Sequence, residues 1–311
     1  MAAIVGSLLL LGAGGAAPAA AAATGSGRNN CTRSCGGIDI PYPFGVEPGC
    51  YHAAWFNLTC DLSFQPPKRF LGDGTVQVLE ISVPNGTVRI NSSRLLYTVG
   101  AGASAASGPW GRGLPIGGPF FLSESRSSVA LVGCGAQVQL RARGGDDDSL
   151  MASCAAVCPL DGDRRIDVES SGACAGVGCC QASIVLGYDS YNIQVNKLNA
   201  SVYAKAAVYL VDQRISSSYA DEVVAGSDYG YFPEALPATL DWVINHTGCP
   251  SVYRDEVASE CLSNNSRCVE AGNNVSNRGR RCACDIGYQG NPYIPDGCQG
   301  ILYMQSRSLC V

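Results

Sequence analysis

Seventeen cysteines constrain the fold of this 311-residue chain more than any other feature. Ten lie between Cys31 and Cys180, six lie between Cys249 and Cys298, and Cys310 stands apart. Cysteine at this density fits an oxidising compartment better than the cytosol. Two even sets and one leftover cysteine predict two disulfide-bonded regions and one unpaired thiol, which could also form an intermolecular bridge.

Spacing alone does not decide how the first ten cysteines pair. Adjacent Cys179 and Cys180 are expected to bond to separate partners, because a bridge between neighbours is strained. The set with unassigned partners is Cys31, Cys35, Cys50, Cys60, Cys134, Cys154, Cys158, Cys174, Cys179 and Cys180.

The N-terminal residues predict a secretory signal peptide. A short apolar run, "IVGSLLLLG", is followed by small residues up to Ala23, so we expect a signal peptide at 1–23 and a linker at 24–30. The opening "MAAI" lacks the usual Lys or Arg. No later stretch has the ~20 apolar residues of a transmembrane helix, so we expect a soluble, secreted chain.

Secretion makes N-linked glycosylation relevant. Asparagine sequons are individually weak motifs, but several together behind a signal peptide indicate a glycoprotein. They start at Asn30, Asn57, Asn85, Asn91, Asn199, Asn245, Asn264 and Asn274.

Composition and alternation predict a mostly β, disulfide-rich fold. Apolar residues make up 46% of the chain and charged residues 15%, which is enough to bury a core. "TVQVLEISV" at 75–83 alternates and ends in the turn signal "PNG", and "TVRI" is placed to pair back with it. Near the end of this region, Thr239 is expected to cap a short helix that contains Leu240 and a buried Trp242.

The last six cysteines form a compact pattern. Residues 249–298 resemble an EGF-like domain, a small scaffold that disulfides hold together because its core is too small to do so alone. Six cysteines allow 15 pairings. The resemblance implies Cys249–Cys268, Cys261–Cys282 and Cys284–Cys298. A zinc site is the weaker alternative, because residues 249–298 contain no histidine and the chain is expected to be secreted.

Three stretches together resemble a known family. They are "CTRSCGGIDIPYPFGVEPGCYHAAWFNLTC" at 31–60, "GVGCCQASI" at 176–184 and "GYQGNPYIPDGC" at 287–298. In this order they resemble the ectodomain of plant wall-associated receptor kinases. The resemblance implies a β-rich galacturonan-binding and associated region at 31–248, an EGF-like domain at 249–298, and binding of the wall polysaccharide pectin (homogalacturonan). Family members are plasma-membrane receptors; this chain is expected in the cell wall space.

The chain departs from the family pattern after Cys298. A divergent tail at 299–311 stands where the receptors usually continue, and no kinase glycine-rich loop, catalytic-loop Asp or "DFG" occurs. We therefore expect a truncated or alternatively spliced ectodomain that acts as a soluble decoy or a wall-sensor fragment; an incomplete gene model is the other interpretation.

The constrained "IPYPFG" stretch at 40–45 has two interpretations. Tyr42 and Phe44 either pack in the core or stack on sugar rings. Pro41 and Pro43 fix an extended backbone, which suits a structural clasp, and core packing is favoured.

Binding of a polyanion requires cations. The net charge is −5, but residues 28–100 hold six basic and five acidic residues, whereas 181–248 hold three basic and seven acidic. Candidate ligand-binding residues are Lys68, Arg69, Arg89 and Arg94, since Arg suits a carboxylate and Lys supplies a point charge. The "RGRR" at 278–281 and the "GGDDDS" at 144–149 are interpreted as solvated loops. No cofactor, metal or nucleic acid is expected; Ca²⁺ could participate only through pectin, without a protein motif.

Two other function classes compete with sugar binding. An enzyme is disfavoured because only His52 and His246 are present, and neither belongs to a catalytic motif. A protein-interaction adaptor that uses the EGF-like domain is the stronger alternative.

Overall fold

The computed structural model describes residues 30–301 apart from 73, 100–103, 115, 134, 143–148, 158–159, 162–163, 166–173, 199–203, 213–232, 251–257 and 274–275. The predicted signal peptide, Cys134, Cys158, Asn199, Asn274 and Cys310 lie outside the described residues. No α-helix occurs in the described part, which is built from strands and seven disulfides. The mostly β, disulfide-rich fold class is therefore confirmed.

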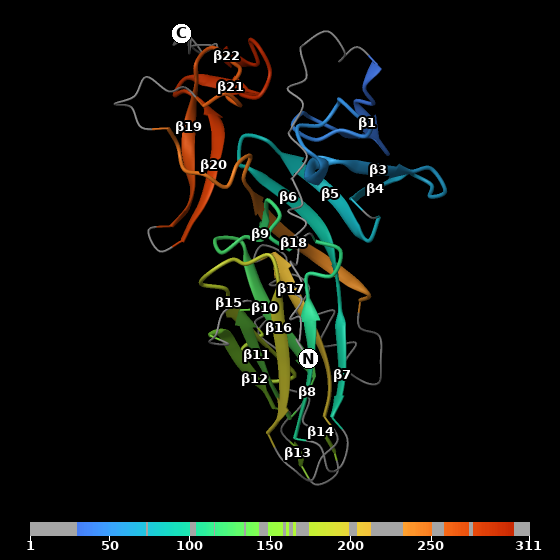
Figure 1. Cartoon of the computed structure of the whole chain (residues 1–311). Coiled ribbons are helices and arrows are strands. Elements are labelled where there is room, and N and C mark those ends of the chain that lie inside the picture. The colour runs from blue at the N-terminus through green and yellow to red at the C-terminus, as the bar shows by residue number, and fades with distance from the viewer. Residues whose placement is uncertain are drawn as a thin grey trace, which may run out of the picture.

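A six-stranded antiparallel sheet carries the first part of the chain (Figure 1). Its strand order is β3-β4-β5-β6-β18-β9, so β18 returns from late in the sequence to pair with β6. The strands are β3 (Leu58–Asp61), β4 (Lys68–Leu71), β5 (Val76–Ser82), β6 (Thr87–Ser93), β18 (Ala235–Trp242) and β9 (Phe120–Leu122).

Two four-stranded sheets lie below it in Figure 1. The first has the order β15-β10-β17-β7, and the second β12-β11-β16-β8. The first comprises β15 (Cys179–Ser183), β10 (Ser127–Gly133), β17 (Ala204–Asp212) and β7 (Leu95–Val99). The second comprises β12 (Leu150–Ala156), β11 (Ala136–Ala142), β16 (Tyr191–Lys197) and β8 (Ala105–Trp110).

The two four-stranded sheets face each other across a buried core. The Cys154–Cys180 disulfide joins β12 of one sheet to β15 of the other. The hydroxyl of Tyr97 on β7 donates to the carbonyl of Ile193 on β16 at 3.4 Å. Strand β11 shows why this packing follows from sequence: its alternate residues Ala136, Val138 and Leu140 are fully buried, and period-two alternation places them on one face.

Short two-stranded ladders complete the structure. They are β1 (Ser34–Cys35) with β2 (Ile38–Asp39), β13 (Leu160–Asp161) with β14 (Arg164–Arg165), β19 (Ser266–Asn273) with β20 (Ser276–Cys284), and β21 (Tyr288–Gly290) with β22 (Cys298–Gly300). A short 3-10 turn, η2 (Ala54–Phe56), precedes β3.

The helix expected around Thr239 is wrong, because this segment is strand β18. Ala238, Leu240 and Trp242 are buried at alternate positions and face the core. The hydroxyl of Thr239 donates to the Asp212 carboxylate at 3.0 Å instead of capping a helix. In a run this short, apolar residues fit a buried strand as well as a helix, and pairing with β6 decides the outcome.

The "IPYPFG" stretch packs into an aromatic core. The Phe44 side chain is 1% exposed, and its ring contacts Phe56 and Trp242 edge-on at centroid distances of 5.1 and 5.6 Å. Tyr42 is half-buried, with its hydroxyl 3.3 Å from Nδ1 of His52. Core packing is thus confirmed for Phe44, and the stretch is a structural clasp.

Disulfides fix both regions of the chain. In the first region the described bridges are Cys31–Cys50, Cys35–Cys60, Cys154–Cys180 and Cys174–Cys179. Cys179 and Cys180 therefore bond to separate partners. In the second region the bridges are Cys249–Cys268, Cys261–Cys282 and Cys284–Cys298, which are the pairs that the EGF resemblance implies.

The β19–β20 hairpin module lies against the six-stranded sheet (Figure 1). The buried Tyr293 ring lies 5.6 Å from that of Trp242, between ring centroids. The side-chain amide of Asn291 donates to the Tyr42 carbonyl at 2.6 Å, so the clasp also holds this module.

A partly buried ion pair strengthens the same contact. Nη2 of Arg280 lies 2.8 Å from Oε1 of Glu260, and the Asn245 amide donates to that oxygen at 3.0 Å. Backbone hydrogen bonds run in both directions between Asn245 and Arg280. The described part of the chain contains no helix long and apolar enough to cross a membrane.

Candidate functional site

Arg69 is not a surface cation, and we remove it from the set of ligand-binding candidates. Its residue is 2% exposed, and its guanidinium donates to the carbonyls of Cys35, Val78 and Leu79 at 3.0–3.1 Å. Burial lowers the pKa of Arg69 from its ordinary value. Adjacent strand residues point to opposite faces, so Lys68 and Arg69 cannot both face one ligand.

The three other predicted cations lie apart from one another. Lys68 on β4 has its ammonium 4.3 Å from the centroid of the Phe64 ring. Arg89 on β6 pairs with the buried Asp212 at 3.3 Å and with Glu80 at 3.8 Å. Arg94 follows β6 and interacts with the Tyr209 hydroxyl. Strand β5 lies between β4 and β6 in the sheet, so Lys68 is not on a strand adjacent to the one that carries Arg89.

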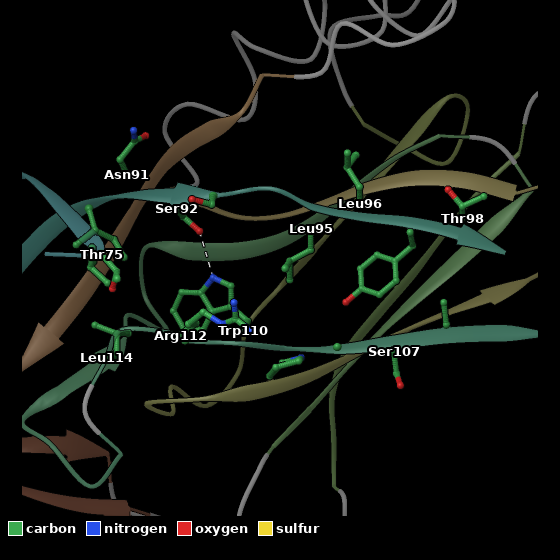
Figure 2. Close-up of a pocket in the computed structure, with 18 residues that line it drawn as sticks. Thr75, Asn91, Ser92, Leu95, Leu96, Thr98, Ser107, Trp110, Arg112 and Leu114 are labelled. Atoms are coloured by element: carbon green, nitrogen blue, oxygen red, sulfur yellow. Dashed lines mark hydrogen bonds between the residues drawn. The ribbon is translucent and has the colours of Figure 1, made fainter. Parts of the chain in front are cut away.

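A hollow of about 660 Å³, here called the slot, opens between β6–β7 and β8. Figure 2 shows Leu95 on the upper strand and Trp110 on the lower strand pointing toward each other, with Ser92 above Trp110. The indole Nε1 of Trp110 donates to Oγ of Ser92 at 3.2 Å, which fixes the ring. Leu96, Thr98 and Ser107 point away from the slot, so they line it with their backbones (Figure 2).

The floor of the slot is aromatic and neutral. Trp110 and Tyr97 are 7% and 6% exposed, so they present small parts of their surface to the hollow. Burial raises the pKa of Tyr97 to about 12, so its hydroxyl stays protonated at ordinary pH. Ser92, Thr75 and backbone groups add hydrogen-bonding atoms to the walls. Apolar walls with a few polar groups are the usual composition of a small-ligand site.

Arg112 is the one charged side chain among the described residues that line the slot. It is exposed, it lies beside Trp110 in Figure 2, and it has no ion-pair partner in the described part of the chain. No carboxylate is present among those same lining residues. A negatively charged group that enters the slot therefore meets a guanidinium and no like charge.

A glycine turn positions Arg112. Gly111 and Gly113 have φ of +97° and +88°, a conformation that favours glycine, and the amide of Leu114 donates to the Gly111 carbonyl at 3.0 Å. A Cβ at Gly113 would lie 1.7 Å from Oγ1 of Thr75, so only glycine allows the turn to approach β5 so closely. The turn thus closes one end of the slot with Leu114 and Thr75 (Figure 2).

Sequence reasoning missed Trp110 and Arg112. The signal was the segment "GPWGRGLPIGG" at 108–118, where one aromatic and one cation stand among glycines and prolines. The residue spacing of this segment gives no indication that β6 and β7, which precede it in the sequence, form the opposite wall of the slot.

These features define a class of protein: a mostly β, disulfide-stapled binding module without an evident kinase part. Residues 31–92 match the family described as wall-associated receptor kinase galacturonan-binding, which confirms the resemblance for this segment. No solved structure matches the chain.

Curated relatives agree with this family. The chain is 29% identical to wall-associated receptor kinase 2 of Arabidopsis thaliana over 289 residues, which cover 89% of the chain and 35% of that relative. It is 26% identical to wall-associated receptor kinase-like 10 of Arabidopsis thaliana, over 88% of the chain and 39% of that relative. It is 26% identical to wall-associated receptor kinase-like 6 of the same plant, over 90% of the chain and 46% of that relative. The chain spans less than half the length of these relatives.

Proposed function

We propose that this chain binds acidic pectic polysaccharide, homogalacturonan and its fragments, without acting on it chemically. The family match of residues 31–92 carries the proposal. The slot supports it, since Ile90, Asn91 and Ser92 of β6 lie within the matched segment and line one wall of the slot. The whole activity of the longer relatives, including any kinase signalling, is not assigned to this chain.

The chemistry of a uronic acid fits the slot. A galacturonate ring has an apolar C–H face, several hydroxyls and one carboxylate. The face packs against Trp110 and Leu95, the hydroxyls meet Ser92 and the backbone, and the carboxylate pairs with Arg112. Lys68, Arg89 and Arg94 remain proposed auxiliary contacts for a longer polymer.

The setting of this activity is proposed as extracellular, in the plant cell wall. Seven disulfides in the described residues require an oxidising compartment to form. Asn30, Asn85 and Asn264 are exposed, so they are the sequons best placed for glycans among the described residues. The boundaries 31–248 and 249–298 are likewise proposed as the two modules.

The first prediction tests the slot with Arg112→Ala. We expect affinity for a defined oligogalacturonide to fall about five- to tenfold, because one partly exposed ion pair is lost. Isothermal titration calorimetry on the secreted full chain measures this. Arg267→Ala is the matched control, since Arg267 is an exposed arginine that pairs with Asp285 in the other module.

A second ligand sharpens the same test. The methyl ester of the oligogalacturonide lacks the charge, so wild type and Arg112→Ala should bind it equally. If the Arg112 variant binds the acid as well as wild type does, the slot is not the site. Failure of wild type to bind any oligogalacturonide at low salt would contradict the function itself. Loss of binding in Lys68→Ala alone would move the site to β4.

A further inference from the structure

Trp55 is an exposed tryptophan directly before a buried residue of the core. Its residue is 48% exposed, whereas neighbouring Phe56 is 1% exposed and belongs to the aromatic core. The amide of Gly45 donates to the Phe56 carbonyl at 3.2 Å, and the amide of Leu58 donates to the Gly45 carbonyl at 2.8 Å. Trp55 is therefore held on a fixed turn rather than on a loose loop.

Disulfides reinforce this position. Cys31–Cys50 ends five residues before Trp55, and Cys35–Cys60 ends five residues after it. Exposing a large aromatic surface to water is unfavourable, and a rigid mounting keeps the ring from folding back onto the core. The backbone is thus fixed while the ring stays open to a ligand, and the question is what surrounds it.

Trp55 borders a second hollow of about 420 Å³. No charged side chain occurs among the described residues that line it, which are Ala54, Trp55, Leu71, Gly72, Gly113, Leu114 and Phe120. Leu114 also lines the slot, so the two hollows adjoin at this side chain. The turn that carries Arg112 contributes Gly111 and Arg112 to the slot and Gly113 to the second hollow.

We propose that the Trp55 hollow is a second saccharide subsite, which receives the part of a galacturonan chain that extends past Leu114 from the slot. This inference rests on the proposed function. An apolar hollow beside an aromatic ring suits the C–H face of a pyranose ring, while the carboxylates and hydroxyls of that unit stay in solvent. A linear polymer needs such an open continuation, whereas a monosaccharide does not.

The subsite predicts a dependence on ligand length. We expect Trp55→Ala to lower the affinity for long oligogalacturonides about three- to tenfold, and to leave the affinity for the digalacturonate unchanged. Arg112→Ala should weaken both ligands. Calorimetry on the secreted full chain gives both affinities. Thermal unfolding of each variant verifies that the fold is retained.

Two variants control for general effects. Trp55→Phe keeps an aromatic ring and should retain most of the affinity for long oligomers. Ile286→Ala removes an apolar side chain that is 94% exposed in the other module, and it should change nothing.

Any of the following results would contradict the proposed subsite. Equal binding of all lengths by Trp55→Ala and wild type would exclude Trp55 from the site, and an equal loss for all lengths would place Trp55 in the slot's own function. If wild type binds the dimer and longer oligomers with the same affinity, the slot acts alone and the proposed function stands. If wild type binds none, the proposed function fails first.

Discussion

At the scale of single residues, neighbours in sequence have opposite roles. Lys68 and Arg69 look equivalent as letters, yet strand geometry directs one toward solvent and the other into the core. Charge composition could therefore predict that β4 carries cations. Which of the two cations points into the core depends on how β4 pairs with β3 and β5, which the sequence does not show. Arg112 was missed for a different reason, because it became a candidate only once the structure showed that no other charged side chain lines the slot among the described residues.

Replacement of Arg69 should destabilise the fold rather than reduce ligand contact. We expect Arg69→Ala to lower the free energy of unfolding by about 3–5 kcal/mol, because buried carbonyls lose their donor and a cavity remains. Lys68→Ala should cost less than about 1 kcal/mol. Chemical denaturation of both variants measures the difference. Similar stabilities for the two variants would show that the Arg69 hydrogen bonds contribute little.

At the scale of elements, sequence patterns predicted strands better than their partners. The alternation of β5 and the turn before β6 are visible in "TVQVLEISVPNGTVRI", and the two strands pair in the structure. Strand β18 was missed because its register depends on β6, from which some 150 residues separate it. The slot has the same origin, since its two walls are set by long-range pairing of β7 with β17 and β8 with β16.

The approach of β20 to the preceding loop depends on one glycine. Gly279 has φ of +128°, and a Cβ there would lie 2.0 Å from the Asn245 carbonyl oxygen. We expect Gly279→Ala to lower the free energy of unfolding by about 2–3 kcal/mol. Gly287→Ala is the control, because Gly287 also has a positive φ but meets nothing within 4 Å, so it should cost only about 1 kcal/mol. Equal midpoints in thermal denaturation would argue against the close approach.

At the scale of the whole molecule, the two proposed modules form a continuous structure. Cysteine grouping predicted where the second module begins, but not that Asn291 would reach the Tyr42 carbonyl, 249 positions earlier. Such contacts between modules leave no local sequence pattern, since neither residue stands out among its sequence neighbours. The packing of Tyr293 on Trp242 implies that the hairpin module supports the core beneath the "IPYPFG" clasp.

The ion pair between Glu260 and Arg280, at the contact between the two proposed modules, should make the free energy of unfolding depend on pH in the acid range. Burial alone would raise the pKa of Glu260, but hydrogen bonds from Arg280 and Asn245 dominate and hold it below its ordinary value of 4.5. The unfolded chain therefore binds a proton more readily than the folded chain does. The stability that Glu260 contributes is complete above about pH 4.5, and it is lost as pH falls through the lower folded pKa.

Glu260→Gln isolates this contribution. The variant should be about 1–3 kcal/mol less stable than wild type at neutral pH, because Arg280 loses its buried counter-charge. The difference should shrink as the pH falls below 4.5, since the wild-type carboxyl becomes neutral as well. Burial lowers the pKa of His52 from its ordinary 6.5 and the charge of Glu260 opposes this, so loss of that charge in the variant also lowers the His52 pKa further. Glu80→Gln, which removes an exposed pair, should be nearly neutral at every pH. The difference in unfolding free energy between Glu260→Gln and wild type could instead stay constant from pH 7 to strong acid. That result would mean that the charge of the Glu260 carboxylate does not stabilise the contact between the two proposed modules.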